Sequence, residues 1–286
     1  MKYIQPGAWV LALWLFLGAG VLAQTAKFGD EIYQPIRGQM GRDVMWMPTA
    51  QDHVMKLLNA AKVSATDRVY DLGAGDGIIP IVAATQFGAK SVGIEYNLKL
   101  VELARRNAQR AGVGDKVNFV QGDIFVEDFS SATVVTLYLL PELNFQLRPT
   151  LLKMKPGTRV VSNEFDMSDW QPDLSIQTGR SKGYLWIVPA EVAGTWSLQG
   201  LAGMATATLD LSQRFQKIGG YITLDQQQHT LLGAELSGDR LSVHFVDGKQ
   251  VTHSLKAKVN GSLLEGELQA GDMNASTNQS IKGRLR

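Results

Sequence analysis

A glycine-rich turn flanked by acids is the part of the sequence best suited to chemistry. It spans residues 71–77 (DLGAGDG) and directly follows an apolar segment. Glycines at alternate positions permit a tight turn and let the backbone approach a ligand without a Cβ clash. A dinucleotide-binding turn would need glycine or alanine at position 78, where this chain has Ile78. An acid two residues before the first glycine suits a ligand with an amino group, which favours the methionine part of S-adenosyl-L-methionine over a pyrophosphate.

Two further acids follow the next two predicted strands. Glu95 ends the second strand, where a carboxylate can accept both ribose hydroxyls, as in dinucleotide-binding folds. Asp123 follows the third strand and is expected to accept the exocyclic amine of adenine, with Ile124 covering the ring. Three acids after three successive strands favour S-adenosyl-L-methionine as the cofactor. The predicted cofactor-binding residues are Asp71, Gly73, Ala74, Gly75, Gly77, Glu95, Tyr96, Asp123 and Ile124.

Alternating strand and helix patterns place these turns at one edge of a sheet. The predicted strands lie at 68–72, 91–95, 117–121, 133–139, 158–162 and 184–189. The predicted helices begin near 50 and lie at 76–88, 97–112 and 142–154. Thr49 and Asp52 predict a capping box for the first helix, and Asn97 predicts a cap for the third. Strands separated by helices indicate βαβ units and a mostly parallel sheet that is covered on both faces.

The last third of the chain has a different pattern. Short runs of alternating apolar and polar residues recur, separated by glycine-containing turns. These runs lie at 205–211, 221–224, 241–245, 252–259 and 263–268. They predict a small antiparallel all-β domain, either a barrel or a sandwich, over residues 193–286. The α/β region then occupies residues 45–192, with a linker at 24–44.

The N-terminal segment is expected to lie outside both regions. Lys2 is followed by no charged residue until Lys27, and the apolar run between them ends in VLA at 21–23. This pattern predicts a signal peptide over residues 1–23, cleaved after Ala23, and an exported or periplasmic protein. The run is marginal for the roughly 20 residues that span a bilayer, so an uncleaved membrane anchor at residues 7–23 stays open.

Composition excludes several classes of function. The chain has 286 residues, of which 45% are hydrophobic, 19% are charged and none is cysteine. Disulfides, thiolate metal sites and a cysteine nucleophile are therefore excluded. The four histidines form no pair at metal-binding spacing on a helix, so no metal site is predicted, and His53 is interpreted as a surface residue. The net charge of +1 gives no general attraction for nucleic acid, and the arginines at 105, 106 and 110 are interpreted as a solvated helix face.

Residues 45–190 resemble a class I, seven-β-strand, S-adenosyl-L-methionine-dependent methyltransferase. The turn at 71–77 is similar to the first motif of that family, Glu95 to its second-strand acid, and Asp123 to its adenine-binding acid. A narrower similarity, carried by 47–49 (MPT), 71–78 and 165–170, is to the lysine methyltransferases of the ATP-synthase c subunit and the adenine nucleotide translocase, with their bacterial relatives. The resemblance implies a Rossmann-like seven-stranded methyltransferase sheet, followed here by the antiparallel domain, and an enzyme that methylates lysine in a protein substrate.

The resemblance also places the methyl acceptor at the end of the fourth strand. Tyr138 to Pro141 occupy the family motif that frames the acceptor, so Tyr138 and Pro141 are the predicted catalytic residues. Burial of Tyr138 in the sheet is the competing interpretation. Two other functions stay open: methylation of a small molecule, and a non-catalytic exported scaffold or binding protein. The expected partners are a protein or small-molecule substrate and, through the N-terminal segment, a membrane, but no nucleic acid.

Overall fold

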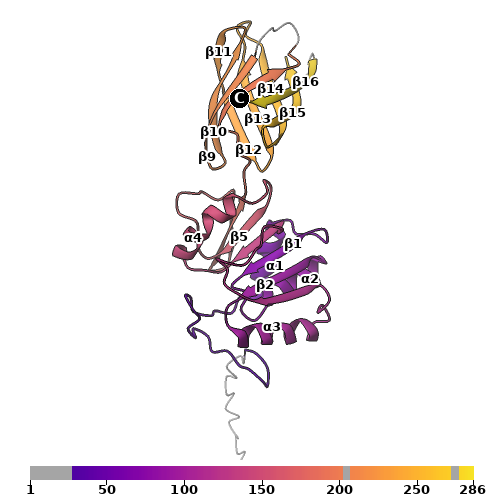
Figure 1. The fold of residues 1–286 in the computed structure, drawn as a ribbon, viewed down its shortest axis with the longest axis vertical. Helices are drawn as coiled ribbons and strands as arrows, with labels where there is room; N and C mark the ends of the chain where they lie inside the picture. Colours follow the sequence, from indigo (N-terminus) through magenta and orange to yellow (C-terminus); the bar gives the residue numbers. More distant parts are fainter. Residues whose placement is uncertain (1–27, 202–206, 272–276) are drawn as a thin grey trace, which may run out of the picture.

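The strands of the described part of the chain form two separate sheets. The computed structural model describes residues 28–201, 207–271 and 277–286. The first sheet has seven strands in the order β3-β2-β1-β4-β5-β7-β6, and the second has nine in the order β11-β10-β9-β8-β16-β15-β14-β13-β12. Figure 1 shows the second sheet, coloured orange to yellow, beyond the end of the first. The predicted fold class, a Rossmann-like α/β sheet followed by an antiparallel domain, is confirmed.

The first sheet is parallel from β1 to β5 and antiparallel at β7 and β6. Its strands are β1 (Arg68–Leu72), β2 (Lys90–Glu95), β3 (Val117–Gln121), β4 (Val134–Leu137), β5 (Arg159–Asn163), β6 (Leu174–Thr178) and β7 (Ser181–Ile187). The four helices in the described ranges are α1 (Gln51–Ala60), α2 (Ile78–Phe87), α3 (Leu98–Arg110) and α4 (Pro141–Leu152). Buried side chains of α1 and α2 pack on one face of this sheet, and those of α4 pack on the other.

The strand order reverses direction at β1, which has β2 on one side and β4 on the other. In open α/β sheets, ligands bind outside the carboxyl ends of the strands at such a reversal. Every residue of β4 is buried, so packing fixes the position of this strand beside β1. The turn after β1 and the segment after β4 are therefore the two parts of the chain best placed to bind ligand.

Helix caps agree with the sequence in one case and not in another. The Asn97 side chain accepts a hydrogen bond from the Lys99 amide at 3.0 Å, so its predicted cap on α3 is confirmed. The capping box predicted at Thr49 is wrong, because Ala50 is the N-cap of α1 and no side chain caps it. Thr49 instead lines the cavity described below.

The edge strand β6 was not predicted from the sequence. Its five residues are exposed or half-buried, so it lacks the buried apolar pattern by which the other strands were found. It forms a hairpin with β7, and Gly179 in the connecting turn has a left-handed φ of 58°. Tertiary pairing at the sheet edge, not local hydrophobicity, defines this strand.

The second sheet is antiparallel throughout and curls until its edges approach each other. The amide of Leu231 donates to the Gly220 carbonyl of β10 at 3.2 Å, and the amide of Leu232 donates to the His244 carbonyl of β13 at 2.8 Å. Of the two predicted forms, the barrel fits this closure. Its strands are β8 (Gly194–Gln199), β9 (Ala207–Arg214), β10 (Lys217–Leu224), β11 (Gln227–Thr230), β12 (Gly233–Ser237), β13 (Arg240–Val246), β14 (Thr252–Asn260), β15 (Leu263–Ala270) and β16 (Thr277–Leu285).

A filled apolar interior holds the barrel together. Trp196 and Phe245 are fully buried in it among aliphatic residues of both halves. The first strand, β8, pairs with the last, β16, which joins the two ends of this region. The sequence missed β8, β11, β12 and β16, and β11 (QQHT) shows why, because it carries no apolar residue.

The segment before α1 is packed against the first sheet. Asp30 accepts hydrogen bonds from Arg106 at 2.7 and 3.1 Å and from Arg110 at 3.0 Å, and Phe28 meets Trp46 edge-on at 5.5 Å. Residues 28–44 are therefore not a free linker, and two of the arginines interpreted as a solvated helix face instead anchor this segment to α3. The predicted signal peptide or anchor at 1–23 lies outside the described residues. In the described ranges no helix is long and apolar enough to cross a membrane.

Close packing around position 77 leaves no room for a side chain larger than that of glycine. The φ of Gly77 is 85°, and a Cβ there would lie 2.5 Å from the Phe119 ring and 2.9 Å from Ala104 Cβ. Gly77→Ala is expected to lower the free energy of unfolding by roughly 2–4 kcal/mol, through overpacking and backbone strain together. Gly112 is the matched control, since its φ is 68° but nothing lies within 4 Å of a Cβ.

Denaturant unfolding of the two variants separates the cost of overpacking from the cost of backbone strain. Gly112→Ala carries only the backbone strain, about 1 kcal/mol. Equal losses of stability in the two variants would show that the contact with Phe119 is not the cause.

Candidate active site

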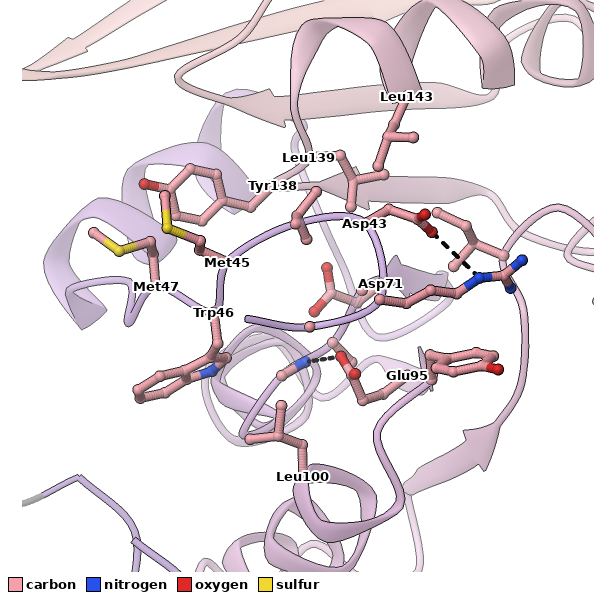
Figure 2. Close-up of a pocket in the computed structure, with 18 of the residues that line it drawn as sticks. Asp43, Met45, Trp46, Met47, Asp71, Glu95, Leu100, Tyr138, Leu139 and Leu143 are labelled. Carbon is pink, nitrogen blue, oxygen red and sulfur yellow. Dashed lines mark hydrogen bonds and ion pairs between the residues drawn. The ribbon is translucent and has the colours of Figure 1, made fainter. Parts of the chain in front are cut away.

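A cavity of about 510 Å³ lies at the carboxyl ends of β1, β2 and β4. This volume is in the range of small-molecule and cofactor sites. Its lining comes from the segment before α1, the glycine turn, the ends of β2 and β3, and the residues after β4 and β5. In Figure 2, Asp71 lies within the loop that carries Asp43, Met45 and Trp46, Glu95 lies below this loop, and Tyr138 and Leu139 lie above it.

Asp71 is a buried acid at this cavity. Its Oδ1 accepts a hydrogen bond from the Thr136 hydroxyl of β4 at 2.6 Å, and the two residues are paired across the strands. Burial raises the pKa of Asp71 to about 7, with a smaller contribution from the negative charges of Glu95 and Asp76, while the Thr136 hydrogen bond opposes the shift. Burial also raises the pKa of Asp76, which lines the same cavity. A positive group bound here would stabilise the ionised form of both acids.

Glu95 is held in place by two backbone amides. Its Oε2 accepts from the Gly75 amide at 2.9 Å, a bond drawn in Figure 2, and its Oε1 accepts from the Asn97 amide at 2.9 Å. Each carboxylate oxygen keeps a second lone pair, so both can also accept a hydroxyl of a ligand. The carboxylate is thereby fixed between the glycine turn and the start of α3, which is the arrangement that the predicted ribose contact needs.

Two glycines of the turn approach neighbouring side chains closely. Gly73 has φ 83°, and a Cβ there would lie 3.0 Å from Leu139. Gly75 has φ 54°, and a Cβ there would lie 2.8 Å from Trp46 Nε1. Gly73, Ala74 and Gly75, all predicted to bind the cofactor, line the cavity. Gly77 is not among the lining residues, and its missing side chain makes room for Phe119. Its role in cofactor binding stays a prediction.

Asp123 lines the cavity but has partners within the chain. Its Oδ1 accepts from the Phe125 amide at 2.9 Å, and its Oδ2 forms an ion pair with Arg42. These two contacts hold the pKa of Asp123 below its usual range. The Arg42 guanidinium also lies 4.8 Å from the centre of the Tyr96 ring. Tyr96 and Ile124 line the cavity too, so the structure brings Asp123 and Ile124, the two residues predicted to contact adenine, together with Tyr96, and contact with adenine stays a prediction.

The opposite end of the cavity is formed by Tyr138, Leu139, Leu140, Leu143 and Phe165. The rings of Tyr138 and Phe165 lie 6.5 Å apart. Tyr138 follows the end of β4 and faces the cavity, against the competing interpretation of a buried strand residue. Burial raises the pKa of its hydroxyl, assisted by the charge of Glu164 and opposed by Arg37, so the group stays protonated at neutral pH.

The structure does not bring Pro141 into the cavity lining. It is the first residue of α4 and is exposed. Proline suits this position, because the first residue of a helix has no intrahelical use for an amide hydrogen. The structure thus gives Pro141 a structural place at the start of α4, and its catalytic role stays a prediction.

His53 is buried, not on the surface as the sequence suggested. It is 3% exposed, and its Nε2 lies 2.9 Å from Asn163 Oδ1 at the end of β5. Residues that sequence reasoning did not assign to the site also line the cavity, and several come from the segment before α1. These are Met40, Arg42, Met45, Trp46, Met47 and Thr49. The sequence feature that could have indicated this lining is the run Met45, Trp46 and Met47, three large apolar residues just before the first helix.

The cavity fits S-adenosyl-L-methionine. This ligand carries two positive groups, a sulfonium and an ammonium, together with a ribose and an adenine. Five acids line the site: Asp43 and Asp123 pair with Arg42, while Asp71, Asp76 and Glu95 form no ion pair within the described residues, and the glycine turn is close enough to bind through its backbone. Asp71 is buried, has a raised pKa and accepts no hydrogen bond from a cationic side chain of the described residues, so it is suited to a cationic ligand.

The state of Asp71 gives a prediction for the pH dependence of binding. A ligand ammonium favours the ionised carboxylate, so binding below pH 7 must release a proton from Asp71. The affinity for S-adenosylhomocysteine should therefore rise by roughly 25-fold as the pH is raised from about 5.5 to about 7.5. Isothermal titration of the protein and of Asp71→Asn tests this, since the variant should show weaker binding with little slope.

Stability without ligand should change in the opposite direction. The folded protein binds the Asp71 proton more tightly than the unfolded chain, because burial raises the pKa from its ordinary value of 3.8. The free energy of unfolding should thus fall as the pH rises from about 4 to about 7, and Asp71→Asn should remove part of that fall. An identical pH slope in the protein and the variant would show that Asp71 is ionised at all these pH values.

Comparison with known proteins agrees with this geometry. Residues 71–174 match the family described as "ANTKMT methyltransferase domain". A protein-lysine N-methyltransferase from Saccharolobus islandicus is 42% identical over 151 residues, which are 51% of this chain and 94% of that protein. The lysine N-methyltransferase of the ATP-synthase c subunit from Mus musculus is 34% identical over 117 residues, or 41% of this chain and 46% of that protein. This chain thus spans less than half the length of the mouse protein.

A solved structure from Salinibacter ruber is similar as well. It is described as an RNA methyltransferase in complex with S-adenosyl-L-homocysteine, with 50% identity and a TM-score of 0.50, and the match covers 51% of this chain and 96% of that one. The extent of the match to the Saccharolobus islandicus protein, together with the matched domain, identifies the family. The chain belongs to the family of the ANTKMT methyltransferase domain and is an S-adenosyl-L-methionine-dependent methyltransferase.

Proposed function

We propose that this enzyme methylates the ε-amino group of a lysine in a protein substrate. The relatives from Saccharolobus islandicus and Mus musculus are named as lysine methyltransferases. The observation that carries the proposal is the apolar and aromatic end of the cavity, lined by Tyr138, Leu140 and Phe165. A lysine side chain has four methylene groups before its amine, and such a lining buries them favourably.

The reaction asks for positioning more than for acid–base chemistry. S-adenosyl-L-methionine supplies an electrophilic methyl group on its sulfonium when it is bound. Asp71, Asp76 and Glu95 would hold its positive groups and its ribose from the glycine-turn side. The amine must approach in line at about 3–3.5 Å and must be uncharged, because its lone pair forms the new carbon–nitrogen bond. The Tyr138 hydroxyl, which stays protonated, can accept a hydrogen bond from the amine and orient that lone pair.

An uncharged lysine is also favoured by the apolar surroundings. Burial of a lysine amine among Leu139, Leu140 and Phe165 disfavours its charged form. The lysine ammonium loses one proton to solvent before attack, and after transfer the methylated nitrogen carries the positive charge that the sulfonium has lost. The bond from sulfur to methyl breaks with its electron pair on sulfur, so the demethylated cofactor leaves as a neutral thioether.

The competing acceptor with a specific observation behind it is RNA, because the similar Salinibacter ruber structure carries that description. Arg42, which contacts the adenine end, forms ion pairs with Asp43 and Asp123. These pairings disfavour a phosphate contact at this side of the cavity. A small-molecule acceptor and a non-catalytic scaffold have no comparable support.

The decisive experiment uses a deuterated methyl donor. The enzyme is incubated with S-adenosyl-L-methionine carrying a CD₃ group and a cell extract, and labelled species are identified by mass spectrometry of protein and RNA. The proposal predicts label on lysine in protein, lost in Asp71→Ala/Glu95→Ala. Label confined to RNA or to small molecules would contradict it.

Tyr138 gives a finer prediction. Tyr138→Phe removes the hydroxyl but keeps the ring beside Phe165, so kcat should fall by about tenfold while affinity for S-adenosylhomocysteine stays within twofold. Leu140→Ala is the companion variant, because it shortens an acceptor-side residue without touching a polar group, and it should raise KM for the protein substrate more than it lowers kcat. An unchanged kcat in Tyr138→Phe would remove the hydroxyl from the mechanism.

The location of the enzyme is also proposed. We propose that residues 1–23 direct export or anchor the chain, as their apolar run and single preceding lysine suggest. Intact mass spectrometry of the protein from membrane and soluble fractions tests this. A species that begins at Gln24 supports cleavage, an uncleaved membrane species supports the anchor, and an uncleaved soluble species contradicts both.

A further inference from the structure

The tight turn between β9 and β10 reaches from the second sheet into the first domain. Gln216 in this turn is 7% exposed. Its Oε1 accepts from the Trp170 indole at 3.0 Å, and its Nε2 donates to the Gln171 carbonyl at 2.7 Å. Both polar atoms of the Gln216 side chain thus form hydrogen bonds with the segment that follows β5. Hydrogen bonds of this kind, buried and directional, fix the relative position of the two segments.

The neighbouring residue of the turn is held in an unfavourable conformation. Phe215 has a φ of 55°, in the left-handed region that glycine prefers and that costs other residues free energy. Its ring stacks on Trp170, with centroids 5.9 Å apart and an angle of 24° between the planes. Trp170 itself is fully buried. An aromatic residue kept in a strained conformation that glycine would adopt without cost indicates that its ring contacts are important to the protein.

Arg148 of α4 connects this turn to the same segment. Its guanidinium lies 4.5 Å from the Phe145 ring centre and 5.3 Å from that of Phe215. It donates to the Met167 carbonyl at 3.0 Å and forms an ion pair with Asp169. Asp169 also pairs with Arg214 of β9 at 2.9 Å. The turn, α4 and residues 167–170 are thereby joined in one contact network.

The network continues to the cavity. Phe165 lines the acceptor end and lies two residues before Met167. The side-chain Nδ2 of Asn144 in α4 donates to the carbonyls of Phe165 and Asp166 at 3.2 and 3.3 Å. Glu164 and Ser168, on either side, have left-handed φ values of 65° and 60°. Such a segment, strained at two positions, depends on its neighbours to keep one conformation.

We propose that Phe215 and Gln216 are positioning residues for the acceptor side of the active site. By stacking on Trp170 and hydrogen-bonding to Trp170 and Gln171, the β9–β10 turn holds residues 164–170 in the one conformation that places Phe165 against the cavity. The second sheet is therefore a working part of the enzyme. The inference deepens the proposed function, since it takes the Phe165 end of the cavity as the acceptor end.

The test uses the full chain with 4-fluorophenylalanine placed at position 165 and read by ¹⁹F NMR. Phe215→Gly is the main variant, because glycine relieves the backbone strain while removing the stacked ring. Gln216→Ala is the second, and Phe215→Tyr is the conservative rescue. Gln226→Gly is the matched control, since Gln226 also has a left-handed φ, 72°, in a hairpin turn of the same sheet and is exposed.

The proposal predicts one sharp resonance in the unchanged protein, in Phe215→Tyr and in Gln226→Gly. It predicts a shifted or split resonance in Phe215→Gly and Gln216→Ala. Hydrogen exchange at residues 164–170 should also become about tenfold faster in these two variants, while affinity for S-adenosylhomocysteine stays within twofold. None of these readouts needs an acceptor, so they stand whether or not lysine methylation is confirmed.

Two results would overturn the proposal. The first is an unchanged resonance and unchanged exchange at 164–170 in both Phe215→Gly and Gln216→Ala, with the fold intact. The second is an equal loss of cofactor affinity and of exchange protection throughout the first sheet, which would indicate a general structural role.

Discussion

The buried carboxylate of Asp71 is the constraint on which the site depends. It lies on the strand where the order of the sheet reverses, and the Thr136 hydroxyl of the adjacent β4 fixes its orientation. Burial keeps its pKa near 7, so the free protein carries this acid partly protonated at neutral pH. A cationic ligand removes that penalty by pairing with the charge. Because the acid belongs to β1 and its partner to β4, any change that separates these strands also disturbs the site.

The other features of the site are arranged around that acid. Glu95 is fixed by the amides of Gly75 and Asn97, so the glycine turn and the start of α3 share one carboxylate. Trp46 covers the turn from the other side, at a distance that leaves no room for a side chain at Gly75. The segment that carries Trp46 is in turn attached to α3 through Asp30. The cavity is thus bounded in part by a segment that precedes the sheet, and ion pairs both at the cavity, from Arg42 to Asp123, and away from it, from Asp30 to α3, attach this segment.

Sequence reasoning identified the parts of the site that strands and short motifs define. Asp71, Glu95 and Asp123 were found because parallel strands bring their carboxyl ends to one edge, whatever the details of packing. It failed where tertiary contacts decide. His53 was interpreted as exposed, but it faces Asn163 across the fold, 110 positions later. Gly77 was predicted to bind the cofactor and Pro141 to be catalytic; the structure shows that Gly77 packs against Phe119 and that Pro141 begins α4, contacts that the sequence did not predict. The strands β6 and β11 carry too few buried residues to be seen without their neighbours.

The most direct test of the account is calorimetric titration of S-adenosylhomocysteine into the full chain and into Asp71→Ala/Glu95→Ala, with thermal unfolding measured on both. The account predicts binding with a Kd on the order of micromolar, and its loss in the variant while the fold is retained. No binding by the folded protein, or equal binding by the variant, would contradict the claim that these two acids form the cofactor site.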